Sequence, residues 1–308
     1  MDRNYARSLE QARLNMQHGH IDGAIDVLRE ILSDDPDLAD AHAYLAICLL
    51  EKRRGHAAAQ EARIALTLEP ESELAIYALA LSEYAQRKFC ASESHIKRLL
   101  EIDPNDPRYY RLLANLYDAT EQKKKVLPLL QKALALSPED PTTLSKLSDF
   151  YLAVNDAVSA EKHAREALEI DPEHTDALVS MGWVLLHTGA IANAREHAIW
   201  SLRHDPSNAS ALYLLTAIKA RANPFIGLWW RYNAWIKRMG MSRSILILLA
   251  AFIVYRIASM AFTDMGRKDI ATIVNFCWMA IVIYSFIGPT LFEKALKKEL
   301  AQVKLKDF

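Results

Sequence analysis

The chain up to about residue 222 carries apolar positions at helical spacing, and the whole pattern repeats every 34 residues. A proline marks the same point of each period: Pro36, Pro70, Pro104, Pro138, Pro172 and Pro206. A period of this length predicts pairs of antiparallel helices, because one pair cannot bury its apolar faces alone and must stack on its neighbours. The sequence therefore predicts an all-α array that acts through its surface.

Small side chains predominate at fixed points of each period. With the proline counted as position 32, position 8 holds Ala12, Ala46, Ala80, Ala114, Ser148, Gly182 and Thr216. Position 20 holds Ala24, Ala58, Ser92, Val126, Ala160 and Ala194, and position 27 holds Ile31, Ala65, Leu99, Ala133, Ala167 and Ser201. Position 7 carries larger apolar residues: Leu45, Leu79, Leu113, Leu147, Met181 and Leu215. Small residues allow two helices of one unit to cross closely, and the larger ones supply contacts between units.

These spacings resemble the tetratricopeptide repeat (TPR) family, whose 34-residue motif has small residues at positions 8, 20 and 27 and proline at 32. The resemblance covers residues 5–222 and implies a TPR superhelix of six repeats plus a capping helix. The implied units are 5–38, 39–72, 73–106, 107–140, 141–174, 175–208 and the capping helix 209–222. In the first repeat position 7 is Gln11, as expected for an end helix with one face in water.

The fourth repeat departs from this pattern. Val126 occupies a small position, and Pro128 follows it early in the second helix. Since proline is tolerated only in a first turn, that helix is expected either to begin late or to kink. The lysines 123–125 are expected to form a solvated turn before it.

The resemblance also implies a working surface, because the first helix of each TPR unit lines a concave groove with positions 2, 5, 9 and 12 or 13. In this sequence the groove candidates are Leu74, Tyr77, Leu81, Tyr84, Arg108, Arg111, Asn115, Val179, Trp183 and His187. A mixture of apolar, aromatic and donor side chains suits a peptide or helix with a few apolar anchors. The alternative is that Tyr77, Tyr84 and Trp183 only fill gaps between repeats.

A different composition begins at residue 223. Aromatic and basic residues alternate in the segment 223–243, where the membrane-interface candidates are Trp229, Trp230, Arg231, Tyr232, Trp235, Lys237 and Arg238. Such a mixture is typical of an amphipathic helix at the lipid headgroups. The alternative is a helix whose aromatic face packs on the last repeat.

Two apolar runs, about 244–263 and 270–292, are each long enough to cross a bilayer as a helix. Together, within 244–308, they predict a transmembrane helical hairpin with a basic tail. Each outer flank of the hairpin carries more basic residues than the short link between its two helices. The repeats and the C-terminus are therefore expected in the cytosol. Arg256 and Asn275 are the intramembrane polar residues. We expect either that they hydrogen-bond to each other or that the Arg256 side chain extends to the membrane interface without a partner.

Charge separates the same two regions. Residues 225–308 hold 12 of the 37 basic and 5 of the 38 acidic residues, so about +7 lies on the tail and about −8 on the repeats. The first residues lack the apolar core of a secretory signal, which fits cytosolic repeats. Cys48, Cys90 and Cys277 have no paired spacing and are expected to be reduced and buried.

Chemistry of other kinds finds little support. No nucleophile elbow, phosphate loop, zinc motif or carboxylate pair is recognisable, so we expect no enzyme, no cofactor and no metal site. His18 and His20 flank a turn without a third ligand. The partners expected are a protein or peptide and a lipid bilayer, and no nucleic acid.

The sequence favours a membrane-anchored TPR adaptor, an integral membrane protein (in the inner membrane if bacterial) that recruits a partner through its groove. The alternative is a regulatory subunit of an oligomeric membrane assembly, a channel, transporter or membrane-deforming complex, built from the hairpins as homo-oligomers. A third interpretation folds the apolar tail back into the groove of a soluble protein.

Overall fold

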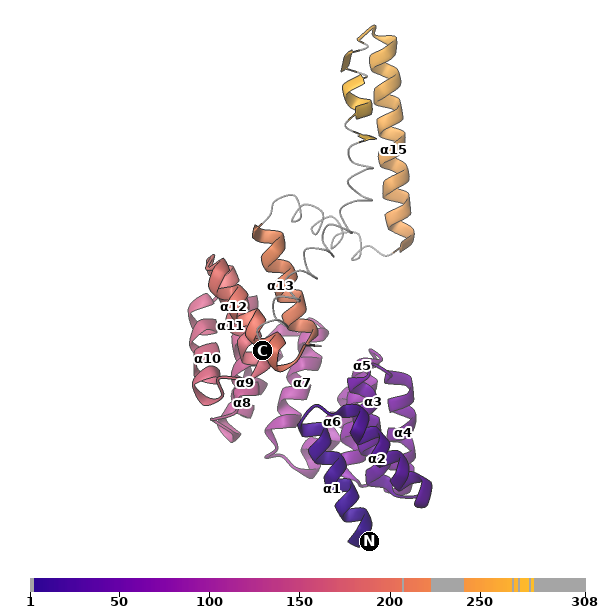
Figure 1. Cartoon of the computed structure of the whole chain (residues 1–308), viewed down its shortest axis with the longest axis vertical. Coiled ribbons are helices and arrows are strands. Elements are labelled where there is room, and N and C mark those ends of the chain that lie inside the picture. Colours follow the sequence, from indigo (N-terminus) through magenta and orange to yellow (C-terminus); the bar gives the residue numbers. More distant parts are fainter. Residues whose placement is uncertain are drawn as a thin grey trace, which may run out of the picture. The chain divides into compact units, whose positions relative to one another are not determined.

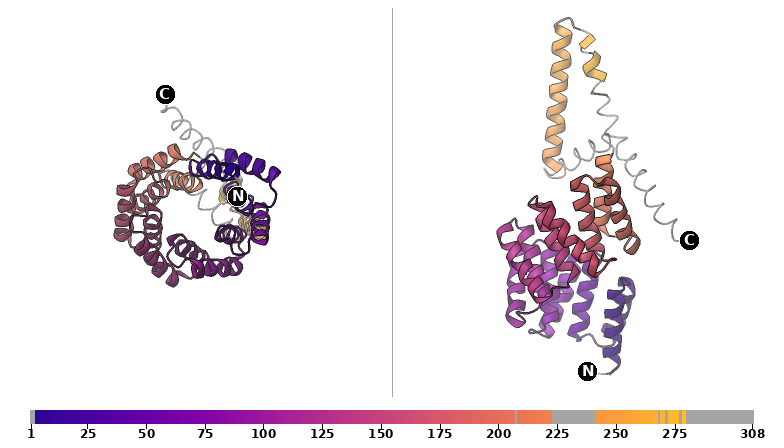
Figure 2. Two further views of the ribbon diagram at one scale, coloured as in Figure 1. Left: turned by 90° about the horizontal axis from the view of Figure 1, so that it is seen from below. Right: turned by 90° about the vertical axis from the view of Figure 1, so that its left-hand side faces the viewer.

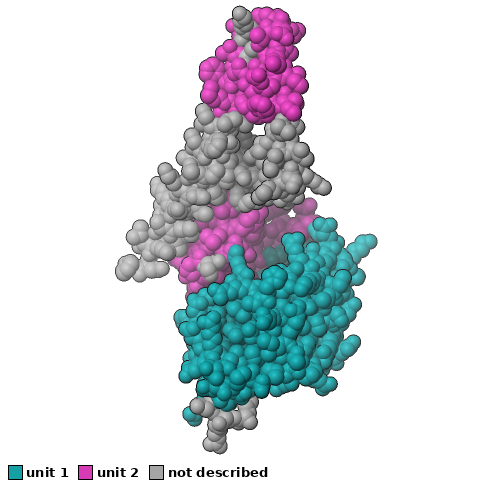
Figure 3. Space-filling model, turned by 90° about the vertical axis from the view of Figure 1, so that its right-hand side faces the viewer, with its two compact units in different colours: residues 1–150 teal, residues 151–308 magenta. Residues whose placement is uncertain are grey.

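The computed structural model describes residues 3–206, 208–222, 241–267, 269–270, 272–276 and 278–279, with side chains described from residue 5 and, in the last helix, from residue 252. All regular structure in these residues is α-helical (Figure 1). The chain divides into two compact units, Met1–Phe150 and Tyr151–Phe308 (Figure 3).

Unit 1 consists of stacked helix pairs, in which the first and second helices alternate along the chain (Figure 2). Its helices are α1 (Arg3–Gln17), α2 (Ile21–Asp34), α3 (Ala39–Glu51), α4 (Gly55–Leu68), α5 (Glu73–Ala85), α6 (Phe89–Ile102), α7 (Pro107–Ala119) and α8 (Lys123–Leu136). Helix α9 (Pro141–Ala153) begins in unit 1 and ends in unit 2. The periodic prolines follow the ends of the second helices by two residues, where proline cannot interrupt a helix.

Unit 2 continues the helix pairs with α10 (Ala157–Ile170), α11 (Thr175–Thr188) and α12 (Ile191–His204). A single helix, α13 (Ala209–Ala222), then packs on α11 and α12. The predicted cap therefore exists as a helix in contact with the sixth repeat. Helix α15 (Met241–Asp264) lies in the tail, and further helical residues are described between 269 and 279.

The small positions of the repeat form the core, as predicted. No side chain at positions 8, 20 or 27 is more than 7% exposed, whether it belongs to unit 1 or to unit 2. Gly182 shows how tight this packing is, because a Cβ built there would run into the side chain of Leu214 on α13. The apolar residues at position 7, which recur every 34 residues from Leu45 to Leu215, are all buried, whereas Gln11 at the same position of the end helix is exposed.

The turn between the two helices of each repeat has a left-handed residue at position 15. Positive φ angles of 57° to 93° occur at Gly19, Arg53, Arg87, Glu121, Asn155 and Gly189, which are 34 residues apart. The next residue donates its N–H across the turn to the carbonyl five residues back at 2.8–2.9 Å, as between His20 and Asn15. This bond is typical of a helix end closed by an αL residue. Four of the six turns therefore hold a residue with a side chain in a conformation that favours glycine.

Helix α8 corrects one detail of the sequence interpretation and excludes one of the two alternatives given for Pro128. It begins at Lys123, so the three lysines form its first turn and do not form a preceding loop. It also continues through Pro128, which lies inside the helix, so the helix does not begin late. Val126 is 4% exposed and fills its small position as a core residue.

The cysteines differ from one another. Cys48 is buried as predicted, and burial raises the pKa of its thiol to about 11. Cys90 is exposed, which corrects the expectation of burial, because the second residue of α6 faces water. Cys277 lies outside the described residues.

The tail is described only in part. The predicted interfacial residues Trp229, Trp230, Arg231, Tyr232, Trp235, Lys237 and Arg238 lie outside the described residues, as do residues 280–308. Within the residues that are described, no helix combines the length and apolar character that a membrane crossing requires.

Candidate partner-binding faces

Unit 1 carries two tyrosines and an arginine where α5 and α7 meet. The ring centres of Tyr77 on α5 and Tyr109 on α7 are 6.1 Å apart. The Arg108 guanidinium carbon lies 5.7 Å from the Tyr77 ring centre and 5.6 Å from that of Tyr109. A guanidinium is attracted to aromatic rings at such distances. Since Tyr109 is buried and the Arg108 side chain is 53% exposed, the arginine is anchored at the surface.

Asp106 holds this arginine in place. It precedes α7 and caps it, accepting the backbone N–H of Arg108 at 2.7 Å. The Arg108 side chain donates Nε to Oδ2 at 2.8 Å and Nη2 to the same oxygen at 2.5 Å. Burial alone would raise the pKa of Asp106, but the hydrogen bonds from Arg108 outweigh it and lower the pKa. The guanidinium is therefore paired with a carboxylate of its own chain.

Glu73 joins the cluster from the start of α5. Its carboxylate accepts the hydroxyl of Tyr109 and lies 3.7 Å from Arg108 Nη2. Burial, and secondly the contact with Glu73, raises the pKa of Tyr109. The pKa of Tyr77 is also raised by burial, although Arg108 and Arg111 oppose the shift. Both phenols therefore remain neutral hydrogen-bonding groups at ordinary pH.

The second predicted arginine, Arg111, is committed to a different carboxylate. Its Nη1 donates to Asp140, just before α9, and lies 3.3 Å from the hydroxyl of Thr143. Asp140 also accepts the backbone N–H of Thr143 at 3.1 Å. Arg111 is only 18% exposed. It therefore acts inside unit 1 and is not a free donor for a partner.

The other predicted groove residues of unit 1 line the same first helices. Leu74, Leu81, Tyr84 and Asn115 are half-buried. The Tyr84 ring meets Phe89 edge-on at 5.9 Å. We call the surface of α3, α5 and α7 the inner face of unit 1, formed by Asp40, Tyr44, Glu73, Leu74, Tyr77, Leu81, Tyr84, Arg108, Asn115 and Asp118.

In unit 2 the predicted residues separate into core and surface. Val179 is 6% exposed and belongs to the hydrophobic core, which corrects its assignment to a binding surface. Trp183 is half-buried and His187 is exposed. The Trp183 ring lies 5.5 Å from that of Tyr213 on α13. We call Trp183, His187 and Tyr213 the inner face of unit 2.

Tyr213 was not identified as a groove residue from the sequence, although its position in the repeat pattern indicates one. It stands at position 5 of the capping helix, the same position as Tyr77 and Arg111 in their repeats. At 54% exposure it is among the exposed large apolar side chains of the described residues. Extending the groove positions into the cap would have identified it.

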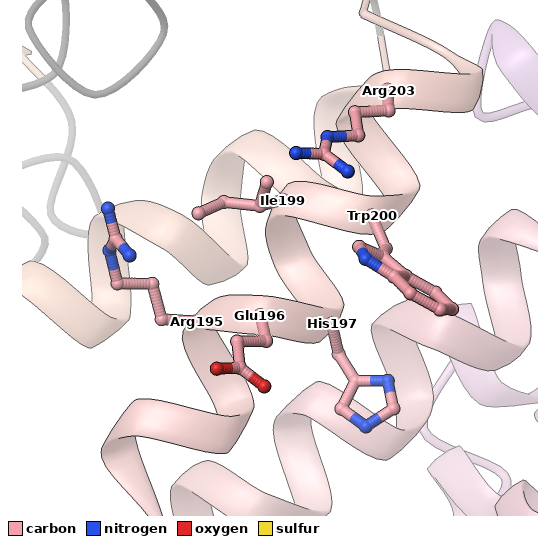
Figure 4. Close-up of a pocket in the computed structure, with 6 residues that line it drawn as sticks. All are labelled: Arg195, Glu196, His197, Ile199, Trp200 and Arg203. Carbon is pink, nitrogen blue, oxygen red and sulfur yellow. The ribbon is translucent and has the colours of Figure 1, made fainter. Parts of the chain in front are cut away.

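The second helices offer a different feature. A depression of about 470 Å³ is lined by Arg195, Glu196, His197, Ile199, Trp200 and Arg203, all on α12 (Figure 4). Burial lowers the pKa of His197, and Glu196 opposes the shift. Trp200 is 51% exposed. This depression lies on a second helix and shares no residue with either inner face.

The two polar residues expected within the membrane do not pair with each other in the structure. The Asn275 side-chain oxygen accepts the hydroxyl of Tyr255 at 2.8 Å and that of Ser259 at 3.2 Å. Trp278 stacks on Tyr255 with ring centres 4.8 Å apart. Arg256 is exposed and has no partner among the described residues. Neighbouring hydroxyls and an aromatic stack therefore join α15 to the segment after it.

Metal ligation is not indicated in the described part of the chain, where no three His, Cys, Asp or Glu side chains gather. The Nδ1 atom of His18 is hydrogen-bonded to the carbonyl oxygen of Leu14 at 2.8 Å.

Known structures resemble this chain at low identity. A TPR protein from Parabacteroides merdae superposes with a TM-score of 0.60 at 15% identity, over 70% of this chain and 84% of its own. A thermophilic TPR protein from Thermus thermophilus gives 0.54 at 17%, over 58% and 98%. A chain of the APC/C hetero-tetramer Cut9–Hcn1 gives 0.56 at 16%, over 68% and 42%, so this protein spans less than half of that chain. At such identities the likeness concerns the fold.

Family models match most of the repeat region. A tetratricopeptide repeat model matches residues 9–73 and 77–141. The model of the cilia and flagella-associated protein 70 middle TPR-like domain matches residues 110–272, more than half of the chain. No curated protein matches the sequence significantly. The chain therefore belongs to the TPR proteins, in the family of this middle TPR-like domain.

Proposed function

We propose that the protein is an adaptor that holds a polypeptide partner on its inner faces while its tail keeps it at the cytosolic side of a membrane. TPR proteins are protein-binding scaffolds, and the aromatic side chains of the first helices carry the recruiting role. Tyr77 and Tyr84 in unit 1 and Trp183 in unit 2 are half-buried, so each is held in place and still offers surface. Anchored aromatic residues of this kind supply most of the binding energy at protein interfaces.

The recruiting role can be tested by capturing partners with the full chain. Alanine at Tyr77, Tyr84 and Trp183 together is expected to lower partner recovery at least tenfold, since one such residue contributes about 2 kcal/mol. Trp200→Ala is the matched control, because this tryptophan is exposed on a second helix. Equal recovery by the triple variant and the control would remove the inner faces from the proposal.

Two observations support a membrane role for the tail. The runs 244–263 and 270–292 contain a single charged residue, Arg256. Large apolar side chains are exposed in the described part of this region: Phe252, Ile253, Val254, Ile257, Met260, Ile273, Phe276 and Met279. Apolar surface of this extent is normally covered by lipid or by a partner. Persistence of the chain in the membrane pellet after alkaline carbonate is expected, and its release would overturn the anchor.

One observation favours a second candidate, assembly through the hairpins. Arg256 is exposed beside apolar side chains and has no partner among the described residues, and an arginine in lipid costs about 2.5–3.5 kcal/mol if unpaired. A carboxylate from another chain would remove that cost. Crosslinked oligomers in detergent that disappear with Arg256→Leu would support this candidate, and a monomer throughout would reject it.

A further inference from the structure

The charges of the inner face of unit 1 differ from those its sequence suggests. The sequence offers Arg108 and Arg111 as the positive groups that would meet a partner. Both are paired with carboxylates of this chain, Arg108 with Asp106 and Arg111 with Asp140. Their charge is therefore compensated before any partner arrives.

The carboxylates left on this face are not compensated. The side-chain carboxylates of Asp40 on α3 and Asp118 on α7 make no hydrogen bond or ion pair with any described residue. Asp40 is half-buried and Asp118 is exposed. Glu73 is shared between Tyr109 and an arginine 3.7 Å away that is already held by Asp106. The unpaired charge of the inner face is thus negative.

Three tyrosines, Tyr44, Tyr77 and Tyr84, lie on the same inner face as these carboxylates. The Tyr44 pKa is raised first by burial and then by Asp40, while Arg13 and, more weakly, Arg108 oppose the shift. The Tyr84 pKa is raised by burial and by Asp118, against Arg87. The hydroxyls of Tyr44, Tyr77 and Tyr84 have no hydrogen-bond partner among the described residues. Half-buried phenols without an internal partner leave both donors and acceptors for an incoming backbone.

We infer that the inner face of unit 1 binds a basic polypeptide segment, with Lys or Arg side chains on Asp40 and Asp118 and backbone groups on the tyrosine hydroxyls. The inference rests on the proposed recruiting function and adds the chemical class of the partner. Charge complementarity selects it, because an acidic segment would meet two uncompensated carboxylates at close range. The aromatic rings favour cationic side chains in the same way.

The test measures binding of two fluorescent 12-residue peptides to the full chain in a nonionic detergent. One peptide alternates lysine with alanine, and the other alternates glutamate with alanine. The lysine peptide is expected to bind at least about tenfold more tightly, and its affinity is expected to fall with added salt. Equal affinities, or tighter binding of the glutamate peptide, would overturn the inference.

A matched pair of variants assigns the binding to this face. Asp40→Asn with Asp118→Asn is expected to weaken the lysine peptide about tenfold, and neither change removes an internal bond. Glu71→Gln with Glu101→Gln makes the same change of net charge at exposed positions off the inner face and is expected to leave binding unchanged. Equal effects of the two pairs would reject the basic partner. The capture experiment with the aromatic triple variant would still decide the recruiting function separately.

Discussion

The inner faces of the two units are built in opposite ways. In unit 1 the aromatic rings are accompanied by an arginine that a capping aspartate holds in place, Arg108 on Asp106. In unit 2 the corresponding surface is a tryptophan beside a tyrosine, Trp183 and Tyr213, over a core that contains Val179. Charged faces give selectivity and rates of association, whereas apolar rings give affinity through buried area. We therefore expect unit 1 to choose the partner and unit 2 to add binding strength.

The largest effect is expected from a change that removes α13, and with it Tyr213, from unit 2. In Gly182→Val the new side chain would meet the fully buried Leu214. We expect the free energy of unfolding of unit 2 to fall by about 3 kcal/mol, measured by hydrogen exchange of α11 to α13. Gly23→Ala is the control in unit 1, because its Cβ would sit 3.5 Å from Asn15 Nδ2 and cause no strain. Unchanged protection in Gly182→Val would show that this contact does not hold the cap.

The next effect is a difference in stability between two N-cap variants. In one of them the capping aspartate also pairs with an arginine, and in the other it does not. Asp140→Ala removes backbone bonds at the start of α9 and leaves Arg111 unpaired, so we expect a loss of about 2 kcal/mol. Asp156→Ala removes the cap of α10, where Ser159 donates its N–H at 3.1 Å and its hydroxyl at 2.6 Å, but breaks no pair with an arginine, and should cost about 1 kcal/mol. Chemical denaturation of both variants measures the difference. Equal losses would mean that the pair with Arg111 contributes nothing to stability.

A smaller effect concerns the left-handed turns that both units share. Arg87 has a φ of 60°, and glycine there should stabilise unit 1 by up to about 1 kcal/mol. In unit 2 Gly189 has a φ of 93°, and Gly189→Ala should destabilise by about 1 kcal/mol. Thermal melting of both variants checks the opposite signs. A change of the same sign in both would show that the αL conformation is not what sets these energies.

The smallest effect is a dependence on pH that belongs to unit 1. The folded pKa of Asp106 lies below its ordinary value of 3.8. Its stabilisation is therefore complete above about pH 4 and is lost as the pH falls through the folded pKa. Asp106→Asn should be less stable than the natural chain by under about 1 kcal/mol at pH 7, and the gap should narrow as the pH falls below about 4. A gap that stays constant with pH in denaturation curves would assign the effect to the cap alone.

The fold could be predicted from the sequence because its period is a local and repeated constraint. Ala46 and Ala194 are buried for the same reason in each unit, namely that two helices cross there. The αL turns could have been predicted as well, since Gly19 and Gly189 stand in the same register. At Arg87 the side chain hides that signal, because the surrounding helices impose the conformation.

The candidate site was less predictable because it depends on which side chains meet. Position 5 of the repeat identifies Arg111 as a surface residue, but the sequence does not show that it pairs with Asp140, which is 29 residues away. The sequence therefore indicated positive groups where the structure leaves negative ones. The assignment of Val179 to the binding surface was wrong for a related reason, because Val179 belongs to a hydrophobic core shared with residues of α12 and α13.

The uniform turns at position 15 make each repeat an interchangeable module. The bond that closes them joins backbone atoms only, at 2.8–2.9 Å, whatever side chain is present. Ser72 caps α5 through Ala75 N–H much as Asp106 caps α7. A chain shortened by residues 73–106 would therefore join α4 to α7 with a cap and both turns intact. Such a chain should still melt in a single transition, one module shorter and without the tyrosines of α5.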